Sequence, residues 1–125
     1  MPRASNIYAN LKSIFHEPNR LAILSALSTA VEGLTFQELK EDCLLTDGNL
    51  SRHLKSLEEA RVVKIRKTFV KNKPKTTVYL TERGRDHFIQ YLQALEEVLK
   101  KATESVAAQE KGAALPLSLA KLLRT

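Results

Sequence analysis

The segment from residue 46 to residue 60 carries the side chains best suited to recognising another molecule. Leucines at helical spacing place one apolar stripe along it, which predicts a helix from Asp47 to about Ala60 with Thr46 as its N-cap. Hydrogen-bonding and basic groups occupy the opposite face and its flanks, at Gly48, Asn49, Ser51, Arg52, Lys55, Ser56 and Glu59. Such a helix can rest on a protein body by one face and contact a partner by the other.

The chemistry of that polar face suits double-stranded DNA. In the major groove asparagine pairs with adenine and arginine with guanine, so we expect Asn49 and Arg52 to contact base edges. The groups better suited to phosphate oxygens are Thr46, Ser51 and Lys55. The charge of Asp47 is unfavourable near phosphates, so we expect this residue to cap the helix or to accept a hydrogen bond from cytosine.

The net charge of the chain is concentrated on the same region. The chain carries 20 Lys and Arg against 14 Asp and Glu, a formal charge of +6, and residues 46–75 alone hold nine basic and three acidic groups. The other 95 residues hold eleven of each and sum to zero. A basic patch on a neutral body is typical of a protein that binds nucleic acid. A solvated lysine-rich loop is the alternative.

Other kinds of site have weaker support. His16, His53 and His87 lack the i, i+3 or i, i+4 spacing of metal ligands and Cys43 stands alone, so we predict neither a metal site nor a cofactor. We expect His53 at the edge of the core and Cys43 as a small buried apolar residue. Because the sequence has no nucleophile–base motif and no Gly-rich phosphate loop, we do not expect an enzyme.

Three helices are predicted before the polar-faced helix. The first covers residues 5–16, and the second begins at Pro18 and runs to about Ala30. Thr35 and Glu38 fit a capping box, so a short third helix follows, to Asp42 or Cys43. Ile7, Leu11, Ile14 and Phe15 lie at helical spacing in the first helix. In the second and third helices the apolar positions expected to face the core are Leu21, Leu24, Leu27, Phe36 and Leu39.

A basic hairpin is predicted after the polar-faced helix. Val63, Ile65 and Phe69 alternate with polar residues, which predicts a strand with an inward apolar side, although Lys67 interrupts that side. Residues 71–75 have turn chemistry, and residues 76–80 have the β-branched and aromatic side chains of a returning strand. The basic side chains predicted to contact DNA here are Arg66, Lys67, Lys71, Lys73 and Lys75.

The last predicted helix begins at Glu82, after a capping Thr81, and carries an apolar seam with alternating spacings of four and three. Packing on their own domain is the alternative for Phe88 and Leu92. Beyond the expected body, where they would be exposed in a single chain, lie Leu95, Leu99, Ala102 and Val106. We therefore predict that the seam pairs with a second copy, alongside the first helix, and that two recognition helices meet a roughly palindromic site. The predicted dimerisation residues are Ile7, Leu11, Phe88, Leu92, Leu95, Leu99, Ala102 and Val106.

Residues 17–90 resemble the winged-helix transcriptional regulators of bacteria and archaea, specifically the MarR/ArsR-like group. The matching motifs are Leu-Thr-Asp-Gly-Asn-Leu-Ser-x-His-Leu, Lys-Pro-x-Thr and Leu-Thr-Glu-x-Gly-Arg. The resemblance implies that the hairpin is a wing along the minor groove or backbone, and that the protein is a homodimer. It implies recognition-helix roles for Thr46, Asp47, Gly48, Asn49, Ser51, Arg52 and Lys55.

Two features depart from that group. The helix before the turn lacks the cysteine-rich box of the metal-sensing members, because Cys43 is the chain's one cysteine. Arg61 stands where relatives commonly have glycine. If this residue adopts a positive φ, arginine costs about 1 kcal/mol relative to glycine; a different turn would avoid that cost.

We therefore predict a mainly α fold with a small β-hairpin. Its parts are a winged helix-turn-helix domain over residues 1–81, a dimerisation helix over 82–110 and a tail over 111–125. The predicted function is a homodimeric transcriptional regulator, in the first instance a repressor, that binds a pseudo-palindromic operator in double-stranded DNA. The alternative is a winged-helix module that binds an acidic protein partner. The chain has no apolar run of membrane-spanning length and no signal peptide, which predicts a cytoplasmic protein. The sequence does not show whether a small-molecule effector binds.

Overall fold

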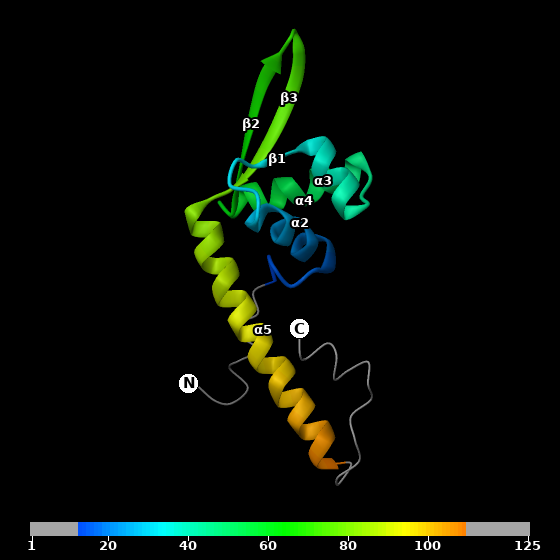
Figure 1. The fold of residues 1–125 in the computed structure, drawn as a ribbon, viewed down its shortest axis with the longest axis vertical. Helices are drawn as coiled ribbons and strands as arrows, with labels where there is room; N and C mark the ends of the chain where they lie inside the picture. The colour runs from blue at the N-terminus through cyan, green and yellow to red at the C-terminus, as the bar shows by residue number, and fades with distance from the viewer. Residues whose placement is uncertain (1–12, 110–125) are drawn as a thin grey trace.

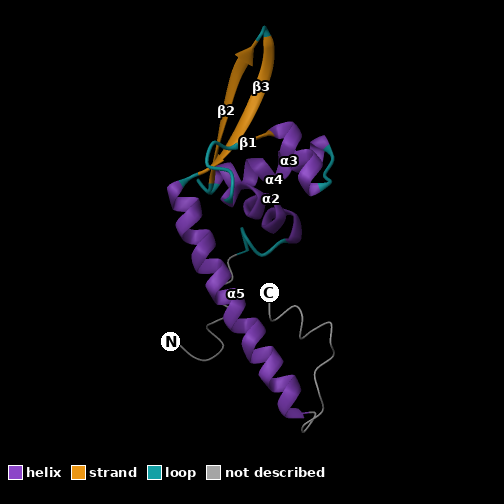
Figure 2. Ribbon diagram, in the orientation of Figure 1, coloured by secondary structure: helices purple, strands orange, loops and turns teal. Residues whose placement is uncertain are grey.

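The computed structural model describes residues 13–109. The elements follow in the order α2 (Pro18–Ser28), β1 (Leu34–Thr35), α3 (Phe36–Cys43), α4 (Asp47–Glu59), β2 (Val63–Val70), β3 (Lys73–Leu80) and α5 (Glu82–Gln109). The hairpin β2–β3 and the distal half of α5 project in opposite directions from a body that contains α2, α3 and α4 (Figure 1). The predicted fold class, mainly helical with a small β-hairpin, is confirmed (Figure 2).

Threonine side chains set the beginnings of three helices, as predicted. Thr35 Oγ1 accepts from the Glu38 backbone N–H at 3.0 Å, and the Glu38 carboxylate accepts from the Thr35 N–H at 2.8 Å, which completes the capping box of α3. Thr46 Oγ1 accepts from the Asn49 N–H at the start of α4. Thr81 Oγ1 accepts from the Gly84 N–H at the start of α5. These caps fix where the functional elements begin.

The sheet has three strands in the order β1-β3-β2, and both pairs are antiparallel. The short strand β1 was not predicted, because two residues carry no periodicity. Gly33 precedes it with φ +80°, and a Cβ there would lie 2.7 Å from the Val78 carbonyl oxygen. Glycine is therefore required for β1 to approach β3.

The core lies where α2, α3, α4, the base of the hairpin and the first part of α5 meet. Phe15 packs on Phe88 and Tyr91 with ring centroids 5.9 and 5.6 Å apart. Phe88 is only 3% exposed, so it belongs to the core of the chain itself. Of the two places predicted for Phe88, the dimer seam and its own domain, the structure shows the second, because the aromatic cluster around Phe15 covers it. The buried core residues are Phe15, Ile23, Leu24, Leu27, Leu39, Leu50, Leu54, Leu57, Val62, Val63, Val78, Phe88 and Tyr91.

The N-terminal helices differ in detail from the prediction. Helix α2 ends at Ser28, and Leu21 and Phe36 pack at the margin of the core while Ile23 lies inside it. The end of the helix predicted over residues 5–16 is not helical, because residues 13–15 form a turn and residue 16 belongs to no element; residues 5–12 lie outside the described residues. The same holds for the predicted dimerisation residues Ile7 and Leu11 and for the tail over 111–125.

The hairpin is longer and its turn tighter than predicted. The turn consists of Lys71 and Asn72, both with positive φ (53° and 66°), and β3 begins at Lys73. Two positive φ values match the type I′ turn whose twist suits a two-residue hairpin. Phe69, predicted to face inward, is 77% exposed, because the helices of the body do not reach the end of the hairpin. The hairpin is thus a free arm over its distal half.

Arg61, which stands where related proteins commonly have glycine, has a positive φ of 63° and so adopts the left-handed conformation. Its N–H donates to the Glu58 carbonyl, and its own carbonyl accepts from Thr81 Oγ1 at 2.8 Å. The turn therefore ties the end of α4 to the start of α5. Since a non-glycine residue in this region costs about 1–2 kcal/mol, the tie is made at the expense of stability.

Candidate nucleic-acid interface

Helices α3 and α4 form a helix-turn-helix whose turn is built by local hydrogen bonds. Leu44 has φ 55° and ψ 47°, and the Leu45 N–H donates to the Lys40 carbonyl at 3.1 Å, which closes the end of α3. Thr46 then opens α4. Lys40 Nζ lies 2.9 Å from Asp47 Oδ1 and adds an exposed ion pair between the helices. The geometry fixes the angle at which α4 leaves the body.

Helix α4 has the two faces that its sequence predicts. Leu50, Leu54 and Leu57 are buried against the body. The seven residues predicted to contact DNA are all exposed: Thr46, Asp47, Gly48, Asn49, Ser51, Arg52 and Lys55. Every predicted residue of α4 and its N-cap is therefore free to meet a partner, and we call these seven residues the recognition face.

Two side chains of the recognition face already contact each other. Arg52 Nη2 donates to Asn49 Oδ1 at 3.1 Å. This bond leaves the other guanidinium donors and the Asn49 amide NH₂ available to a partner. Asp47 does not cap the helix, because Thr46 holds that position, and its charge is instead paired with Lys40. Lys40 was not predicted as part of the site, since nothing in its helical spacing marks it.

Gly48 lies in the first turn of α4 with open space around it. A Cβ at this position would meet no atom within 4 Å, so packing within the described chain does not require glycine. Glycine is poor in a helix, by about 1 kcal/mol relative to alanine. The surface at Gly48 is bare backbone, which a phosphate or a base edge can approach closely.

His53 lies on the inner side of α4 and connects it to α2. Only 3% of the residue is exposed, in agreement with a place in the core margin, and Nδ1 accepts from Arg20 Nε at 3.3 Å. Glu17 Oε2 lies 3.9 Å from Nε2. Burial lowers the pKa of His53, the nearby Glu17 carboxylate partly opposes this, and Arg20 and Arg52 lower the pKa further. His53 is therefore a positioning contact for α4 and not part of the recognition face.

The wing carries its cations on both faces and at its turn. Alternation along the strands places Arg66, Lys73 and Lys75 on one face and Lys67 on the other, while Lys71 lies in the turn. All five are exposed. Arg66 lies over the Tyr79 ring, 5.9 Å from its centroid, which holds its guanidinium near the base of the wing.

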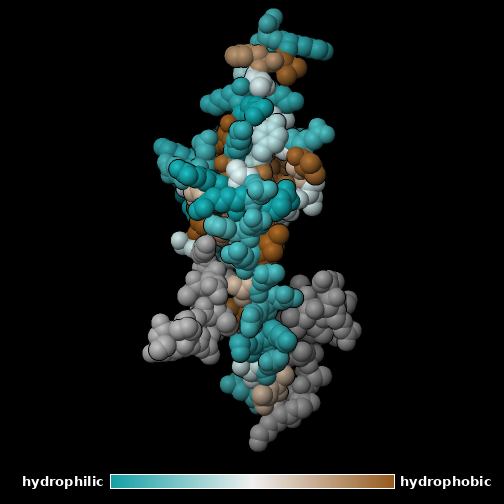
Figure 3. Space-filling view, turned by 90° about the vertical axis from the view of Figure 1, so that its left-hand side faces the viewer, coloured by the Kyte–Doolittle hydropathy of each residue, from teal (hydrophilic) through white to brown (hydrophobic). Residues whose placement is uncertain are grey.

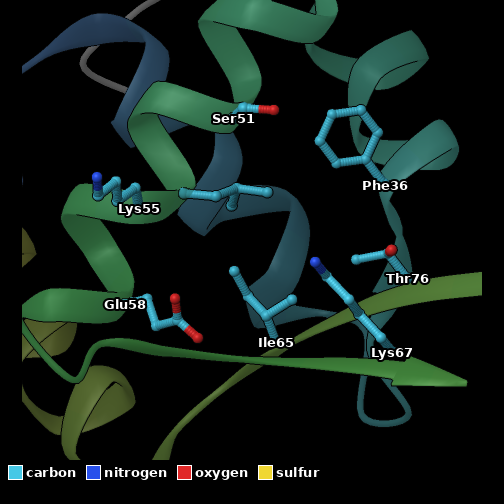
Figure 4. Close-up of a pocket in the computed structure, with 8 residues that line it drawn as sticks. Phe36, Ser51, Lys55, Glu58, Ile65, Lys67 and Thr76 are labelled. Atoms are coloured by element: carbon cyan, nitrogen blue, oxygen red, sulfur yellow. The ribbon is translucent and has the colours of Figure 1, made fainter.

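A hollow separates the recognition helix from the wing (Figure 4). It has a volume of about 350 Å³. Ser51, Lys55 and Glu58 line it from α4, and Lys67 and Thr76 line it from the wing. The Lys67 ammonium points into the hollow, whereas the Lys55 ammonium points away from it, and the Glu58 carboxylate adds one negative charge to the lining (Figure 4). Thr76 was missed as a site residue, although its register opposite Lys67 marks it once the strands are paired.

The long helix α5 has a second exposed surface. Leu92, Leu99 and Val106 are 41, 51 and 41% exposed, and Ala102 between them is also exposed. Leu95, predicted to lie beyond the body, is instead half-buried against the core. Of the predicted seam, the residues that remain on a free surface are therefore mainly Leu92, Leu99, Ala102 and Val106, which we call the α5 seam.

Cys43 is half-buried beside the core, which fits its predicted apolar role in part. Burial raises the pKa of its thiol, and the neighbouring Asp42 charge raises the pKa further. Within residues 13–109, no three His, Cys, Asp or Glu side chains lie close enough together to hold a metal ion. In the same range no helix is long and apolar enough to cross a membrane.

Comparison with known proteins supports the assignment of the helix-turn-helix and the wing to a nucleic-acid interface. Residues 19–99 match the family described as winged helix DNA-binding domain. An uncharacterized protein of Methanocaldococcus jannaschii is 40% identical over 87 residues, which cover 70% of this chain and 94% of that protein. The solved structure of a transcriptional regulator homologue from Pyrococcus horikoshii OT3 is 28% identical, with a TM-score of 0.71, and the match covers 78% of this chain and 97% of that one.

The fold extends to more distant proteins. A MarR-family transcriptional regulator from Silicibacter pomeroyi is 20% identical, with a TM-score of 0.54, over 94% of this chain and 73% of that chain. At this identity the likeness concerns the fold alone. It covers α5 as well as the body, because nearly the whole chain is matched.

Proposed function

Because this chain belongs to the winged helix DNA-binding domain family, we propose that it is a homodimeric transcriptional regulator that binds a specific sequence in double-stranded DNA. The observation that carries the proposal is the recognition face, where all seven predicted residues of α4 are exposed while the leucines of the same helix are buried. A helix held in this way can enter the major groove without loss of its packing.

Helix α4 supplies the base contacts in this proposal. Arg52 and Asn49 are exposed on neighbouring turns and joined by a hydrogen bond, so they can address adjacent base pairs as a unit. Arginine pairs in bidentate fashion with guanine and asparagine with adenine. Ser51 and Lys55, at the hollow beside the wing, are placed for the phosphates that border the groove.

The wing supplies contacts to the backbone. Arg66, Lys67, Lys71, Lys73 and Lys75 are exposed on an arm that extends beyond the body (Figure 1). Cations at the end of a free hairpin have little part in its folding, whereas each phosphate they neutralise releases counterions and favours binding. We assign them to the phosphates that flank the sequence read by α4.

A second copy covers the α5 seam in the proposed dimer. Leucine, alanine and valine on one stripe would otherwise stay in water. Pairing of two α5 helices presents two recognition faces about one helical turn of DNA apart, which requires a pseudo-palindromic site. Repression is the mode we propose, since occupation of a promoter is sufficient for it, whereas activation needs a further contact. The proposal implies a cytoplasmic location, where the chromosomes of bacteria and archaea lie.

Selection of genomic DNA fragments by the purified protein tests this function. We expect enrichment of fragments that share an inverted repeat. Arg52→Ala should abolish the enrichment, and Lys101→Ala, which removes the same charge from an exposed site on α5, should leave it unchanged. No enriched sequence would contradict the proposal. Unchanged DNA affinity after charge reversal of Lys71 and Lys73 would instead favour an acidic protein partner.

A further inference from the structure

The end of the wing carries an exposed aromatic side chain, and the proposed contacts between the wing lysines and DNA phosphates do not explain it. Phe69 is 77% exposed, and its cross-strand partner is Pro74, which is also exposed. Val70 next to the turn is 49% exposed. The end of the wing shows hydrophobic atoms among hydrophilic ones (Figure 3).

The register places Phe69 directly opposite Pro74 on the same face of the wing. Val70 and Lys73 flank the two-residue turn and occupy the hydrogen-bonded site that closes it. Phe69 and Pro74, the next pair away from the turn, therefore occupy a non-hydrogen-bonded site. Side chains at such sites approach most closely, and proline is tolerated there because no ladder bond is lost. The two rings therefore form one apolar knob, which we call the tip pair.

The tip pair points to the side of the wing on which the recognition helix lies. Ile65, Lys67 and Phe69 alternate with the outward residues of β2, and Ile65 and Lys67 line the hollow beside α4. Pro74 and Thr76 line a second hollow with Phe36 at the start of α3. The tip pair thus continues, beyond the body, the surface that faces the same partner as α4.

Every charged residue near the tip pair is a cation. Lys67 precedes the pair on the same face and Lys71 lies in the turn, while Lys73 and Lys75, the chain neighbours of Pro74, lie on the opposite face of the wing. No acidic residue occurs between residues 60 and 81. The centres of protein–protein interfaces are depleted of lysine, so an apolar knob beside these lysines is a poor match for a protein partner. A surface that is apolar within and anionic at its borders is the better match.

The minor groove of DNA has that character, because deoxyribose edges line its walls and a row of phosphates runs along each rim. Phenylalanine and proline are among the apolar side chains that minor-groove proteins insert there. Resting on the proposed function, we propose that the tip pair enters the minor groove beside the sequence read by α4. In this arrangement Phe69 packs on the sugars while Lys71 and Lys73 contact the phosphates of the two rims.

Replacement of Phe69 separates this apolar contact from the charged ones. In anisotropy titrations on a selected duplex, Phe69→Ala should weaken binding about tenfold per wing, because the burial of a phenylalanine side chain against the sugars is lost. The dependence of affinity on salt should not change, since no charge is lost. Lys71→Ala should instead lower the salt slope by about one unit for each wing. Phe69→Leu should recover part of the affinity.

Two further measurements locate the contact. Hydroxyl radicals abstract hydrogen from sugars exposed in the minor groove, so the wild-type protein should protect sugars beside the α4 site, and Phe69→Ala should lose that protection alone. Val31→Ala serves as the matched control, because Val31 is 88% exposed in the loop between α2 and β1 and off the wing. Circular dichroism and thermal unfolding should show Phe69→Ala to be folded, as expected for a side chain so exposed.

The outcomes distinguish this inference from the proposed function. If the wild-type protein binds no duplex in a salt-dependent manner, the proposed function fails first. If it binds, but Phe69→Ala keeps wild-type affinity and footprint, the tip-pair assignment is wrong while the function stands. Capture of anionic lipid vesicles by the wild type and not by Phe69→Ala, with DNA affinity unchanged, would overturn the assignment in favour of a membrane surface.

Discussion

The two parts of the molecule that project from the body, the end of the wing over residues 67–75 and the distal part of α5 over residues 96–109, are both largely exposed but differ in charge (Figure 1). The wing end holds four lysines and no acidic residue. The distal part of α5 holds two lysines and three glutamates around an apolar stripe. Equal exposure therefore does not imply the same kind of partner.

Charge decides what each projection can bind. A concentrated positive charge attracts a polyanion and repels a second copy of itself. A nearly neutral helix with one apolar stripe permits self-association, as in coiled-coil pairs. On this reasoning the proposed dimer contact and the proposed DNA contact lie at opposite ends of the molecule, so that each can be changed without the other.

The largest effect is expected at the α5 seam. Leu99→Lys places a charge in the proposed dimer contact, and we expect a monomer in sedimentation or light scattering. Loss of bivalent binding should reduce affinity for the palindromic site about 100-fold or more. Ala108→Lys adds the same charge on the opposite side of the helix, at an exposed position, and should leave a dimer. A Leu99→Lys protein that stays dimeric would remove the α5 seam from the dimer contact.

The next effect is expected at the recognition face, with the dimer intact. Arg52→Ala removes the proposed guanine contact and should reduce affinity for the selected site about 10- to 100-fold per half-site. Affinity for unrelated DNA should fall far less, because that binding comes from phosphates. Titration of both duplexes measures the two values. An equal loss on both would make Arg52 a phosphate contact only.

A smaller effect is expected from the buried link between α4 and α2. Burial lowers the pKa of His53, so the unfolded chain binds the proton more readily. Stability should therefore be full above the ordinary histidine pKa near 6.5, and should fall as the pH drops from there to the lowered folded value. Urea unfolding at several pH values measures this. His53→Asn keeps an acceptor for Arg20 and should lack this part of the pH dependence; the same dependence in both proteins would assign it elsewhere.

The smallest effect is expected at the turn after α4. Arg61→Gly relieves the positive φ but adds freedom to the unfolded chain, so the net gain in unfolding free energy should be about 0.5–1 kcal/mol. Arg61→Ala, which keeps the strain, should show no such gain. Thermal unfolding of the three proteins gives the comparison. Equal stability of the glycine and alanine variants would show that this turn stores no strain.

The parts of the fold predicted from sequence are those fixed by local interactions. Thr35, Thr46 and Thr81 start their helices because a hydroxyl satisfies an N–H three residues on, a rule that is contained in the sequence. The recognition face followed from the leucine spacing of α4, since one helix turned by 100° per residue has only one way to bury that stripe.

The parts that escaped prediction depend on what the rest of the chain covers. Phe69 lies on the same face of β2 as the half-buried Ile65, as its spacing predicts, but it is exposed because the helices of the body do not reach the end of the strand. Phe88 lies on the heptad spacing of α5, but Phe15, distant in sequence, buries it. Strand β1 exists only because Gly33 lets the chain approach β3. Each of these outcomes depends on contacts between segments distant in the sequence, which the spacing of apolar residues along one segment does not reveal.

The salt dependence of binding tests the central claim, that the recognition face and the wing bind DNA as one basic surface. The basic side chains that each protomer offers to phosphates are Lys55, Arg66, Lys67, Lys71, Lys73 and Lys75. If about three to five of them make contacts, the slope of log affinity against log salt should be about −5 to −9 for the dimer. Anisotropy titrations of the wild-type protein on the selected duplex, at four or more salt concentrations, measure it. A slope in that range, with tighter binding than to a scrambled duplex at every salt concentration, is the predicted result. A slope near zero, or equal affinity for both duplexes, would contradict the account.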